Sequence, residues 1–244
     1  MKHYDLYADG RCADAYRRLG WDGFCVTVGY GTDYRRLQDG ARRLGGDVSV
    51  GAVLTKDVEK DAKKAIDLGA DLVIVDGRTD EPARAASESW DVDLIVNPEL
   101  NEERDLVDQW SSGLDHIMSS FMAERDIGYL VNCGNLLHSS GLRRTRLIGR
   151  IMQNLRLAKK YGFKVVVSSG SRTPQDARNP SDLTQVAMML GMDEDAAENA
   201  TSKNTEHFMK KSHDRNSGDV LMRGLSVKSW GAAERRPKRK HGWY

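Results

Sequence analysis

Long apolar runs are missing from this sequence of 244 residues. Apolar stretches such as 72–75 are far shorter than the roughly 20 residues that a membrane-spanning helix needs. Charged and polar residues also interrupt positions 1–11, where a secretory signal would need an unbroken apolar segment. We therefore predict a cytoplasmic protein with no membrane partner.

Motifs that would hold a metal ion or a nucleophile are also missing. The three cysteines, Cys12, Cys25 and Cys133, form no C-x-x-C pair, which argues against a disulfide framework and a zinc knuckle. The six histidines form no H-x-H or H-x-x-x-H pattern, although a multinuclear metal site needs several converging imidazoles and carboxylates. No G-x-S-x-G turn and no G-x-G-x-x-G loop occurs. We expect no catalytic residue, no metal site and no protein-bound cofactor.

Acidic residues are missing from one long segment. Residues 127–175 contain 9 Lys and Arg but no Asp or Glu, although the whole chain has 36 acidic residues and a net charge of only +1. By contrast, residues 1–126 hold 16 basic and 26 acidic residues. An anionic partner is the plainest physical reason for such a segment. The alternative is a positively charged face that only aids solubility.

Short apolar stretches alternate with amphipathic ones along the chain. Seven stretches are rich in Val, Ile, Leu and aromatic residues and predict strands: 4–6, 24–28, 48–54, 72–75, 94–96, 129–131 and 164–167. Their continuous apolar character suits a parallel sheet that is covered on both faces. We predict an α/β fold with one TIM-barrel-like (β/α) barrel over residues 1–230, irregular or one strand short. Residues 231–244 read as a basic disordered tail, which binds nucleic acid or does nothing specific.

Helix signals lie between the strands. Asp57 and Thr79 are placed to cap helices, and Gly69 is placed to end the first of them. In the long helix predicted over 142–160, six apolar residues share one face: Leu147, Ile148, Ile151, Met152, Leu155 and Ala158. The opposite face carries a basic stripe of Arg143, Arg146, Arg150, Gln153 and Lys160. No acid lies three or four positions away, so the stripe predicts contact with RNA or another polyanion, with a solvated face as the alternative.

The ends of the predicted strands are where a (β/α) barrel carries any chemistry. After the seventh strand, Ser168, Ser169, Gly170 and Ser171 offer hydroxyl and backbone N–H groups, and Arg172 follows. This run predicts a phosphate-binding loop, with a polar strand-to-helix turn as the equally weighted alternative. Asp9 and Asp76 follow two other strands and could hold a single hard cation, although such residues are more often loop or cap residues.

Several short patterns, in order, resemble one known family. They are Gly113-Leu114-Asp115-His116-Ile117, Tyr129 to Asn132, Leu136-Leu137, Ser140, Arg143-Arg144, the helix ending in Leu157 to Tyr161, and Val165 to Gly170. Together they resemble archaeal ribonuclease P protein component 3, the family of the thirty-kilodalton subunit of archaeal and eukaryotic ribonuclease P. The likeness is densest over 113–190 and extends across 1–226, so the tail lies outside it.

The resemblance implies a barrel related to the polymerase and histidinol phosphatase fold. It also implies a role in the ribonucleoprotein that removes the 5′ leader from precursor tRNA. In that family the RNA is the catalyst and needs Mg²⁺, and the expected partners are the ribonuclease P RNA, precursor tRNA and component 2, the small RRM-like subunit. The related phosphatases carry H-x-H after their first strand, where this chain has Leu6-Tyr7-Ala8-Asp9.

We therefore predict a ribonuclease P subunit that is not catalytic by itself. The residues expected to contact RNA are Arg143, Arg144, Arg146, Arg150, Lys159, Lys160, Arg172 and Arg178. Two alternatives stay open. One is a stand-alone barrel enzyme that acts on a phosphorylated small molecule, and the other is an assembly partner whose basic surface meets an acidic protein.

Overall fold

Seven parallel strands form one sheet whose order follows the chain. The computed structural model describes the chain except for residues 45–46, 103–104, 106–109, 223, 232–239 and 243–244. The strands are β1 (Tyr4–Ala8), β2 (Gly23–Gly29), β3 (Asp47–Leu54), β4 (Leu72–Asp76), β5 (Leu94–Val96), β6 (Gly128–Asn132) and β7 (Val165–Ser168). Each strand pairs with the next in parallel, and β1 also contacts β7. The prediction of a (β/α) barrel one strand short of eight is confirmed, and each of the seven predicted strands is present.

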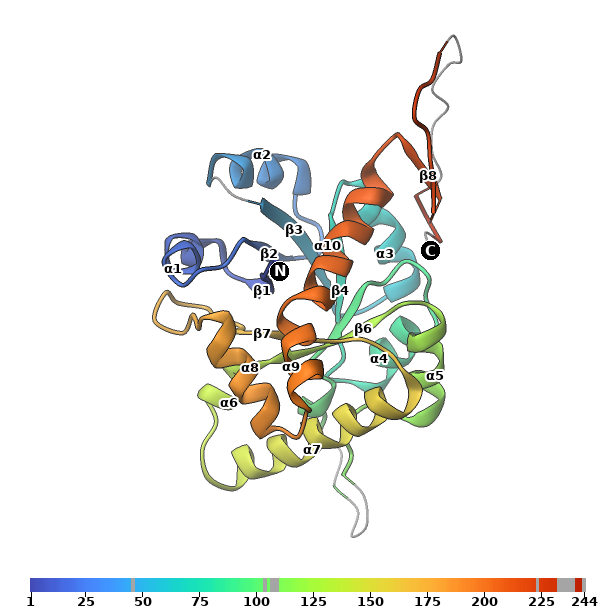
Figure 1. Ribbon diagram of the computed structural model, residues 1–244. Coiled ribbons are helices and arrows are strands. Elements are labelled where there is room, and N and C mark those ends of the chain that lie inside the picture. Colours follow the sequence, from blue (N-terminus) through green and yellow to red (C-terminus); the bar gives the residue numbers. More distant parts are fainter. Residues whose placement is uncertain (45–46, 103–104, 106–109, 223, 232–239, 243–244) are drawn as a thin grey trace.

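Helices connect the strands and form an outer layer around the sheet (Figure 1). They are α1 (Ala13–Arg18), α2 (Tyr34–Leu44), α3 (Val58–Asp67), α4 (Asp80–Ser87), α5 (His116–Glu124), α6 (Cys133–Leu137), α7 (Gly141–Tyr161), α8 (Pro180–Met189), α9 (Glu194–Thr201) and α10 (Lys203–Asn216). Short 3-10 turns cover Gly10–Cys12 and Pro98–Leu100, and a small hairpin joins β8 (Val220–Met222) to β9 (Leu225–Ser226).

The predicted helix boundaries hold, but two predicted caps do not. Gly69 ends α3 with a backbone angle φ of +98°, a conformation that glycine adopts without steric cost. Asp57 precedes α3 in the left-handed region, and its side chain makes no capping hydrogen bond. Thr79 precedes α4 and also makes none. A polar residue at the right position therefore did not guarantee a cap, because its side chain must also point back to the first turn.

Strand residues alternate between the inside of the barrel and the helical layer. On β4, Leu72 and Ile74 join the interior cluster, while Val73 and Val75 pack against the helices. The interior is a filled core of ten buried residues: Tyr4, Leu6, Cys25, Leu72, Ile74, Leu94, Val96, Leu130, Val166 and Phe208. Phe208 belongs to α10, which lies across the sheet in Figure 1. Side chains therefore fill the barrel, which is not a pore.

α10 covers the N-terminal ends of the strands through charged contacts. Arg215 Nη2 lies 2.8 Å from Asp93 Oδ2, and Lys211 Nζ lies 3.2 Å from Asp93 Oδ1. Burial opposes ionisation of Asp93, but the two cations hold its pKa below the usual value. His207 and Lys164 likewise lie 2.7 Å and 2.6 Å from Asp126. Some of the acidic excess of residues 1–126 is thus neutralised inside the fold.

The end of the chain returns to the barrel in the three residues described there. His241 Nε2 lies 3.1 Å from Asp67 Oδ1, and the backbone N–H of Gly242 donates to Asp91 Oδ1 at 2.7 Å. Lys240 Nζ donates to Asn216 Oδ1 at 3.2 Å. The disordered tail over 231–244 stays a prediction, because residues 232–239 and 243–244 lie outside the described part. No helix in that part is both long and apolar enough to cross a membrane.

Candidate functional site

α7 presents cations at both of its ends. Arg143, Arg144 and Arg146 are exposed in the first two turns, and Lys159 and Lys160 are exposed in the last turn. The predicted apolar face of the helix packs against the barrel. The lysines suit the negative end of the helix dipole, whereas the arginines stand at its positive end, where a cation is unfavourable. The helix dipole therefore does not explain why three arginines lie at the start of α7.

Arg150 does not belong to this exposed surface, so the prediction of a continuous basic stripe is wrong there. Its side chain is 4% exposed, and its Nε donates to Asp105 Oδ1 at 2.8 Å. Its Nη1 donates to the backbone oxygens of Glu99 at 3.0 Å and Asn101 at 2.7 Å. Arg146 Nε also lies 3.0 Å from Asp105 Oδ2. The two arginines hold the connection between β5 and α5 against α7, and Arg150 is withdrawn from the predicted RNA contacts.

Other cations of the acid-free segment also pair with distant acids. Lys159 Nζ lies 3.3 Å from Asp193, and Lys164 Nζ lies 2.6 Å from Asp126. The lack of acids three or four positions away concerns only neighbours on the same helix, and these acidic partners lie 34 and 38 positions away in the chain. Within the described part of the chain, Arg143 and Arg144 form no ion pair. The first turn of α7 therefore holds two adjacent exposed cations without an ion pair, and Arg156, Lys160 and Arg172 are further exposed cations of this segment.

The serine run after β7 faces inward, so the predicted phosphate loop is also wrong. Ser168, Ser169 and Ser171 are all at most 3% exposed. The hydroxyl groups of Ser168 and Ser169 both donate to the carboxylate of Asp5, and the backbone N–H of Ser169 donates to Asp5 Oδ2 at 2.9 Å. The anion bound by these groups is thus a side chain of β1. This contact joins β1 to β7, the two end strands of the sheet.

The hydrogen bonds around Asp5 extend to Tyr16, and Gly170 lies in close contact with its neighbours. The phenol of Tyr16 lies 2.7 Å from Ser169 Oγ and also hydrogen-bonds Ser171 Oγ. Gly170 has a φ of +60°, and a Cβ added there would overlap Asn132 Oδ1 at 1.7 Å. Burial raises the pKa of Asp5, while its hydrogen bonds from Ser168 and Ser169 act in the opposite direction. The glycine therefore serves backbone geometry and close packing.

Amide side chains close the C-terminal ends of β4, β5 and β6. Asn97 Oδ1 accepts hydrogen bonds from Asn135 Nδ2 at 2.7 Å and Asn132 Nδ2 at 3.3 Å. Asn97 Nδ2 donates to Asp76 Oδ2 at 3.3 Å. The same carboxylate oxygen of Asp76 lies 3.3 Å from Arg78 Nε. Burial raises the pKa of Asp76, and Arg78 opposes that shift. The strand-end polar residues thus bond mainly to one another.

Arginines also follow several strands at this end of the barrel. Arg172 is exposed after β7, and Arg178 is half-buried, with its Nη1 donating to the carbonyls of Gln175 and Ala177 at 2.8 Å and 2.9 Å. Arg11 Nη2 lies 2.8 Å from Asp9 Oδ2. The carboxylate that follows β1 therefore also has a partner within the chain. Sequence reasoning missed Arg78 and the exposed Arg156 of α7, because neither falls in the stripe or in the serine run.

The described residues offer little covalent chemistry. Cys12, Cys25 and Cys133 are buried, and burial raises the pKa of each thiol, that of Cys133 to about 12. A thiol held in its protonated form is a poor nucleophile. Glu99 is buried beside the phenol of Tyr129, at 2.9 Å, and burial raises its pKa to about 7. No group of three His, Cys, Asp or Glu residues within the described part could hold a metal ion.

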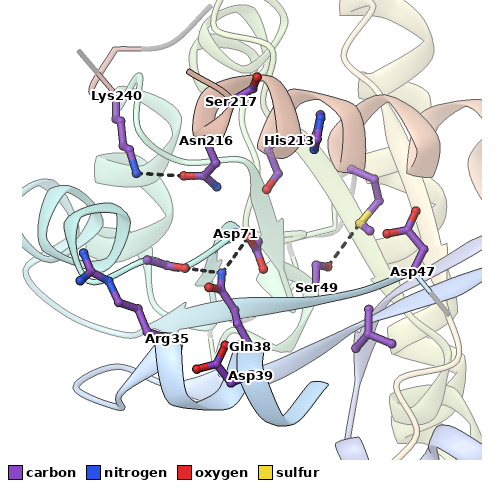
Figure 2. Close-up of a pocket in the computed structure, with 14 residues that line it drawn as sticks. Arg35, Gln38, Asp39, Asp47, Ser49, Asp71, His213, Asn216, Ser217 and Lys240 are labelled. Carbon is purple, nitrogen blue, oxygen red and sulfur yellow. Dashed lines mark hydrogen bonds between the residues drawn. The ribbon is translucent and has the colours of Figure 1, made fainter. Parts of the chain in front are cut away.

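A pocket of about 650 Å³ opens at the opposite, N-terminal end of the barrel, between α2, β3 and α10 (Figure 2). Asp39, Asp47 and Asp71 line it together with Arg35 and other polar residues. Gln38 Nε2 donates to Asp71 Oδ1 at 2.9 Å, and Lys240 Nζ donates to Asn216 Oδ1 at 3.2 Å. Barrels rarely carry chemistry at this end, and the mixed charge favours no ligand class.

Comparison with known proteins gives consistent matches. The family described as RNase P subunit p30 matches residues 55–217. Ribonuclease P protein component 3 of Methanosarcina barkeri is 33% identical over 159 residues, which cover 63% of this chain and 63% of that protein. Component 3 of Methanococcus maripaludis strain C7 is 30% identical over 175 residues, covering 68% and 72%. The first of these matches thus spans less than two thirds of its relative.

Solved structures show the same architecture. A chain from a "cryo-EM structure of archaeal Ribonuclease P with mature tRNA" superposes with a TM-score of 0.73 at 21% identity and covers 97% of this chain and 99% of that one. An amidohydrolase superposes with a TM-score of 0.52 at 9% identity, covering 86% and 74%. At these identities the likeness concerns the fold.

The fold and the site define a class of protein: a (β/α) barrel whose strand-end polar groups are turned inward and whose outer helix α7 exposes arginines. The match over 55–217 then gives the family. The chain belongs to the ribonuclease P subunit p30 family.

Proposed function

We propose that this chain is a protein subunit of ribonuclease P, which assists the catalytic RNA in removing the 5′ leader from precursor tRNA. The observation that carries the proposal is the family match over residues 55–217, with component 3 among the relatives. In this proposal the RNA performs the cleavage and binds the Mg²⁺ that it needs, and the protein holds no cofactor. The buried thiols and the inward-facing serines support a role in binding rather than in bond cleavage.

The first turns of α7 are the proposed centre of the RNA contact. Arg143 and Arg144 are exposed cations at the unfavourable end of a helix dipole, and a polyanion would compensate that cost. The planar guanidinium group binds phosphate with two hydrogen bonds and stacks on bases. The proposed outer contacts are Arg146, Lys159, Lys160, Arg172 and Arg178, several of which also make the internal contacts described above.

The proposed partners are the ribonuclease P RNA, precursor tRNA within the complex, and component 2. The location that goes with this role is the cytoplasm. The alternative of a stand-alone enzyme for a phosphorylated small molecule loses its main support, because Ser168 and Ser169 bind Asp5. The alternative of a purely protein-binding partner is an outcome of the experiment below.

Reconstituted cleavage tests the proposal. Ribonuclease P RNA and component 2 are assayed on precursor tRNA at low Mg²⁺, with and without this chain, and the chain is assayed without RNA. We expect leader removal to depend on the chain and to be missing when the RNA is left out. A chain that adds nothing to cleavage contradicts the proposal. Association that survives nuclease treatment, without any RNA affinity, favours the protein-binding alternative.

A matched pair of variants locates the RNA contact within the same assay. Arg143→Ala/Arg144→Ala removes two adjacent exposed arginines of α7, and Arg17→Ala/Arg18→Ala removes two adjacent exposed arginines of α1. Each variant loses the same formal charge. We expect the α7 variant to need a higher chain concentration for half-maximal cleavage, by roughly 10-fold, because each lost phosphate contact weakens binding. The α1 variant should stay within about twofold of the wild type.

A further inference from the structure

The side chain of Trp110 lies flat on α7 at Gly149. A Cβ added to Gly149 would lie 2.7 Å from Cε2, 2.8 Å from Cζ2 and 3.1 Å from Cδ2 of the Trp110 indole. Cε2 and Cδ2 are the two atoms that the indole rings share, so the helix contacts the face of the indole and not its edge. Glycine in the middle of a helix lowers its stability relative to alanine. The close approach of the indole gives a physical reason for glycine at this position.

The chain that follows Trp110 is fixed to its surroundings by hydrogen bonds. The backbone N–H of Ser111 donates to Asp105 Oδ1 at 3.0 Å, and Asp105 is held in turn by arginines of α7. Asn154 of α7 donates from Nδ2 to the carbonyl of Ser112 at 3.0 Å. These contacts hold the indole in place before any ligand binds, which lowers the entropic cost of binding.

The other face of the indole is open to solvent. Trp110 is 39% exposed, and within the described residues no other ring and no cation stacks on it and its Nε1 makes no hydrogen bond. By contrast, Trp21 is 7% exposed, and its Nε1 donates to the carbonyl of Arg178 at 2.9 Å. Trp21 has the contacts of a core residue, whereas Trp110 has one face against the protein and one face available to a ligand.

Cations continue along the same face of α7, the long helix at the lower edge of Figure 1. Steps of four, three and four positions place Gly149 in one row with Gln153, Arg156 and Lys160. Arg156 and Lys160 are exposed, and neither forms an ion pair within the described residues. Lys160 Nζ lies 5.2 Å from the ring centroid of Tyr161. The exposed indole face therefore stands in a row with two cations whose charge no carboxylate of the described part pairs with.

The carboxylates that pair with α7 bind its other cations. In the described part of the chain, Asp105 lies 3.0 Å from Arg146 and 2.8 Å from Arg150. Asp193 lies 3.3 Å from Lys159. α7 itself contains no acidic residue. The row that runs from the indole towards the end of α7 is therefore positively charged.

An aromatic face followed by cations suits a single-stranded nucleic acid. Proteins that bind single strands combine aromatic side chains, on which bases stack, with cations that bind the backbone phosphates. A base within a duplex is covered on both faces by its neighbours, so only an unpaired base can stack on Trp110. The seven positions from Gly149 to Arg156 span about 10 Å along the helix, the length of about three stacked nucleotides. An apolar anchor of a protein interface would instead lie in a desolvated pocket, whereas Gln153 and Arg156 follow Gly149 here.

We propose that the exposed face of Trp110 stacks on an unpaired base of a single-stranded RNA segment whose phosphates bind Arg156 and Lys160. The proposal rests on the proposed function and deepens it, because it names RNA without base pairs as the ligand and an aromatic side chain as its binding site. Stacking neutralises no phosphate, so it contributes to affinity without contributing to the salt dependence of binding. This property distinguishes Trp110 from the arginines of α7.

The affinity of the full chain for single-stranded octaadenylate RNA tests the stacking. Trp110→Leu keeps an apolar side chain on Gly149 but has no aromatic face, whereas Trp110→Phe keeps one. We expect Trp110→Leu to bind roughly 10-fold more weakly with an unchanged salt slope, and Trp110→Phe to stay within about threefold of the wild type. The matched control Tyr30→Ala removes an aromatic side chain of 38% exposure after β2 and should stay within about twofold.

Two further measurements test the cations and the need for an unpaired base. Arg156→Ala/Lys160→Ala should lower the slope of log affinity against log salt by roughly 1.4, at about 0.7 for each phosphate contact on a single strand. A fully paired RNA hairpin should bind equally well to the wild type and to Trp110→Leu, because its bases stack on one another.

Four results would overturn the proposal. They are equal octaadenylate affinity in the wild type and Trp110→Leu, a wild-type chain without affinity for octaadenylate, an equal loss in Trp110→Phe and Trp110→Leu, and an equal loss of affinity for the paired hairpin. The third result would assign Trp110 to packing alone. Weaker binding of component 2 by Trp110→Leu with unchanged RNA affinity would assign the indole to a protein interface and also overturn it. Failure of the proposed function appears separately, in the cleavage assay.

Discussion

The serine run after β7 and the first turns of α7 both carry the groups that bind anions, yet the fold uses them in opposite ways. Ser168 and Ser169 are buried and donate to Asp5 of β1. Arg143 and Arg144 are exposed and have no ion-pair partner in the described part of the chain. The first region closes the barrel, and the second is available to another molecule.

An anion-binding pattern in the sequence can therefore be satisfied by a carboxylate of the same chain. Arg150 makes the same point on the helix that carries Arg143. The two residues are seven positions apart, but Asp105 and two backbone carbonyls engage the guanidinium of Arg150. Groups that satisfy a buried internal acid stabilise the fold, whereas exposed groups without such a partner are the most available to a ligand.

The largest expected effect concerns the inward-facing region. Asp5→Ala removes the acceptor for Ser168 and Ser169 and should cost about 4 kcal/mol of the free energy of unfolding, because several buried donors lose their partner. Asp9→Ala changes the strand-end carboxylate that pairs with the exposed Arg11 and should cost less than about 1 kcal/mol. Urea unfolding of both variants measures the difference. Equal losses would show that Asp5 does not close the ring of strands.

The buried carboxyl of Glu99 predicts a pH dependence of stability. Its pKa is raised to about 7 in the folded chain, so folding favours the protonated form. Protonated Glu99 contributes on the order of 3 kcal/mol to the free energy of unfolding at pH values below the unfolded pKa of about 4.5. This contribution is lost as the pH rises towards 7. Glu99→Gln keeps a neutral side chain and should flatten the stability profile between pH 4.5 and 7. An unchanged profile in Glu99→Gln contradicts this assignment.

A substitution at Arg150 should change the stability of the fold but not the affinity for RNA. Arg150→Met should lower the free energy of unfolding by about 2 kcal/mol, since it removes the donor to two backbone carbonyls and leaves Asp105 with Arg146 and the backbone N–H of Ser111 as partners. Arg143→Met is the matched change at an exposed position and should alter stability by less than about 0.5 kcal/mol. Thermal unfolding compares the two. A stable Arg150→Met protein with reduced RNA affinity would restore Arg150 to the RNA contacts.

Much of the fold could be predicted from local patterns. The strands are continuous apolar runs, and the helical period of α7 places Leu147, Ile151 and Leu155 in the core. α10 could not be found in this way, because its buried residues include Lys211 and Arg215, which read as surface residues. Both pair with Asp93, which lies far away in the chain, so no local period reveals the contact.

The site was predicted less well for the same physical reason. Exposed cations at the start of α7 were recognised from residue type and helical phase, because both are local properties. The engagement of Arg150 by Asp105 spans 45 positions, and that of Ser169 by Asp5 spans 164. Whether a polar group is satisfied depends on such distant contacts, which only the folded chain brings together.

The salt dependence of the affinity for ribonuclease P RNA tests whether Arg143 and Arg144 contact RNA while Arg150 does not. It is measured for the wild type, Arg143→Ala/Arg144→Ala and the buried-arginine control Arg150→Met, each at a temperature where it is folded. We expect the slope of log affinity against log salt to fall by roughly 1.4 to 1.8 in Arg143→Ala/Arg144→Ala, because two phosphate contacts are lost. We expect an unchanged slope in Arg150→Met. An unchanged slope in Arg143→Ala/Arg144→Ala, or a larger fall in Arg150→Met, would contradict this expectation.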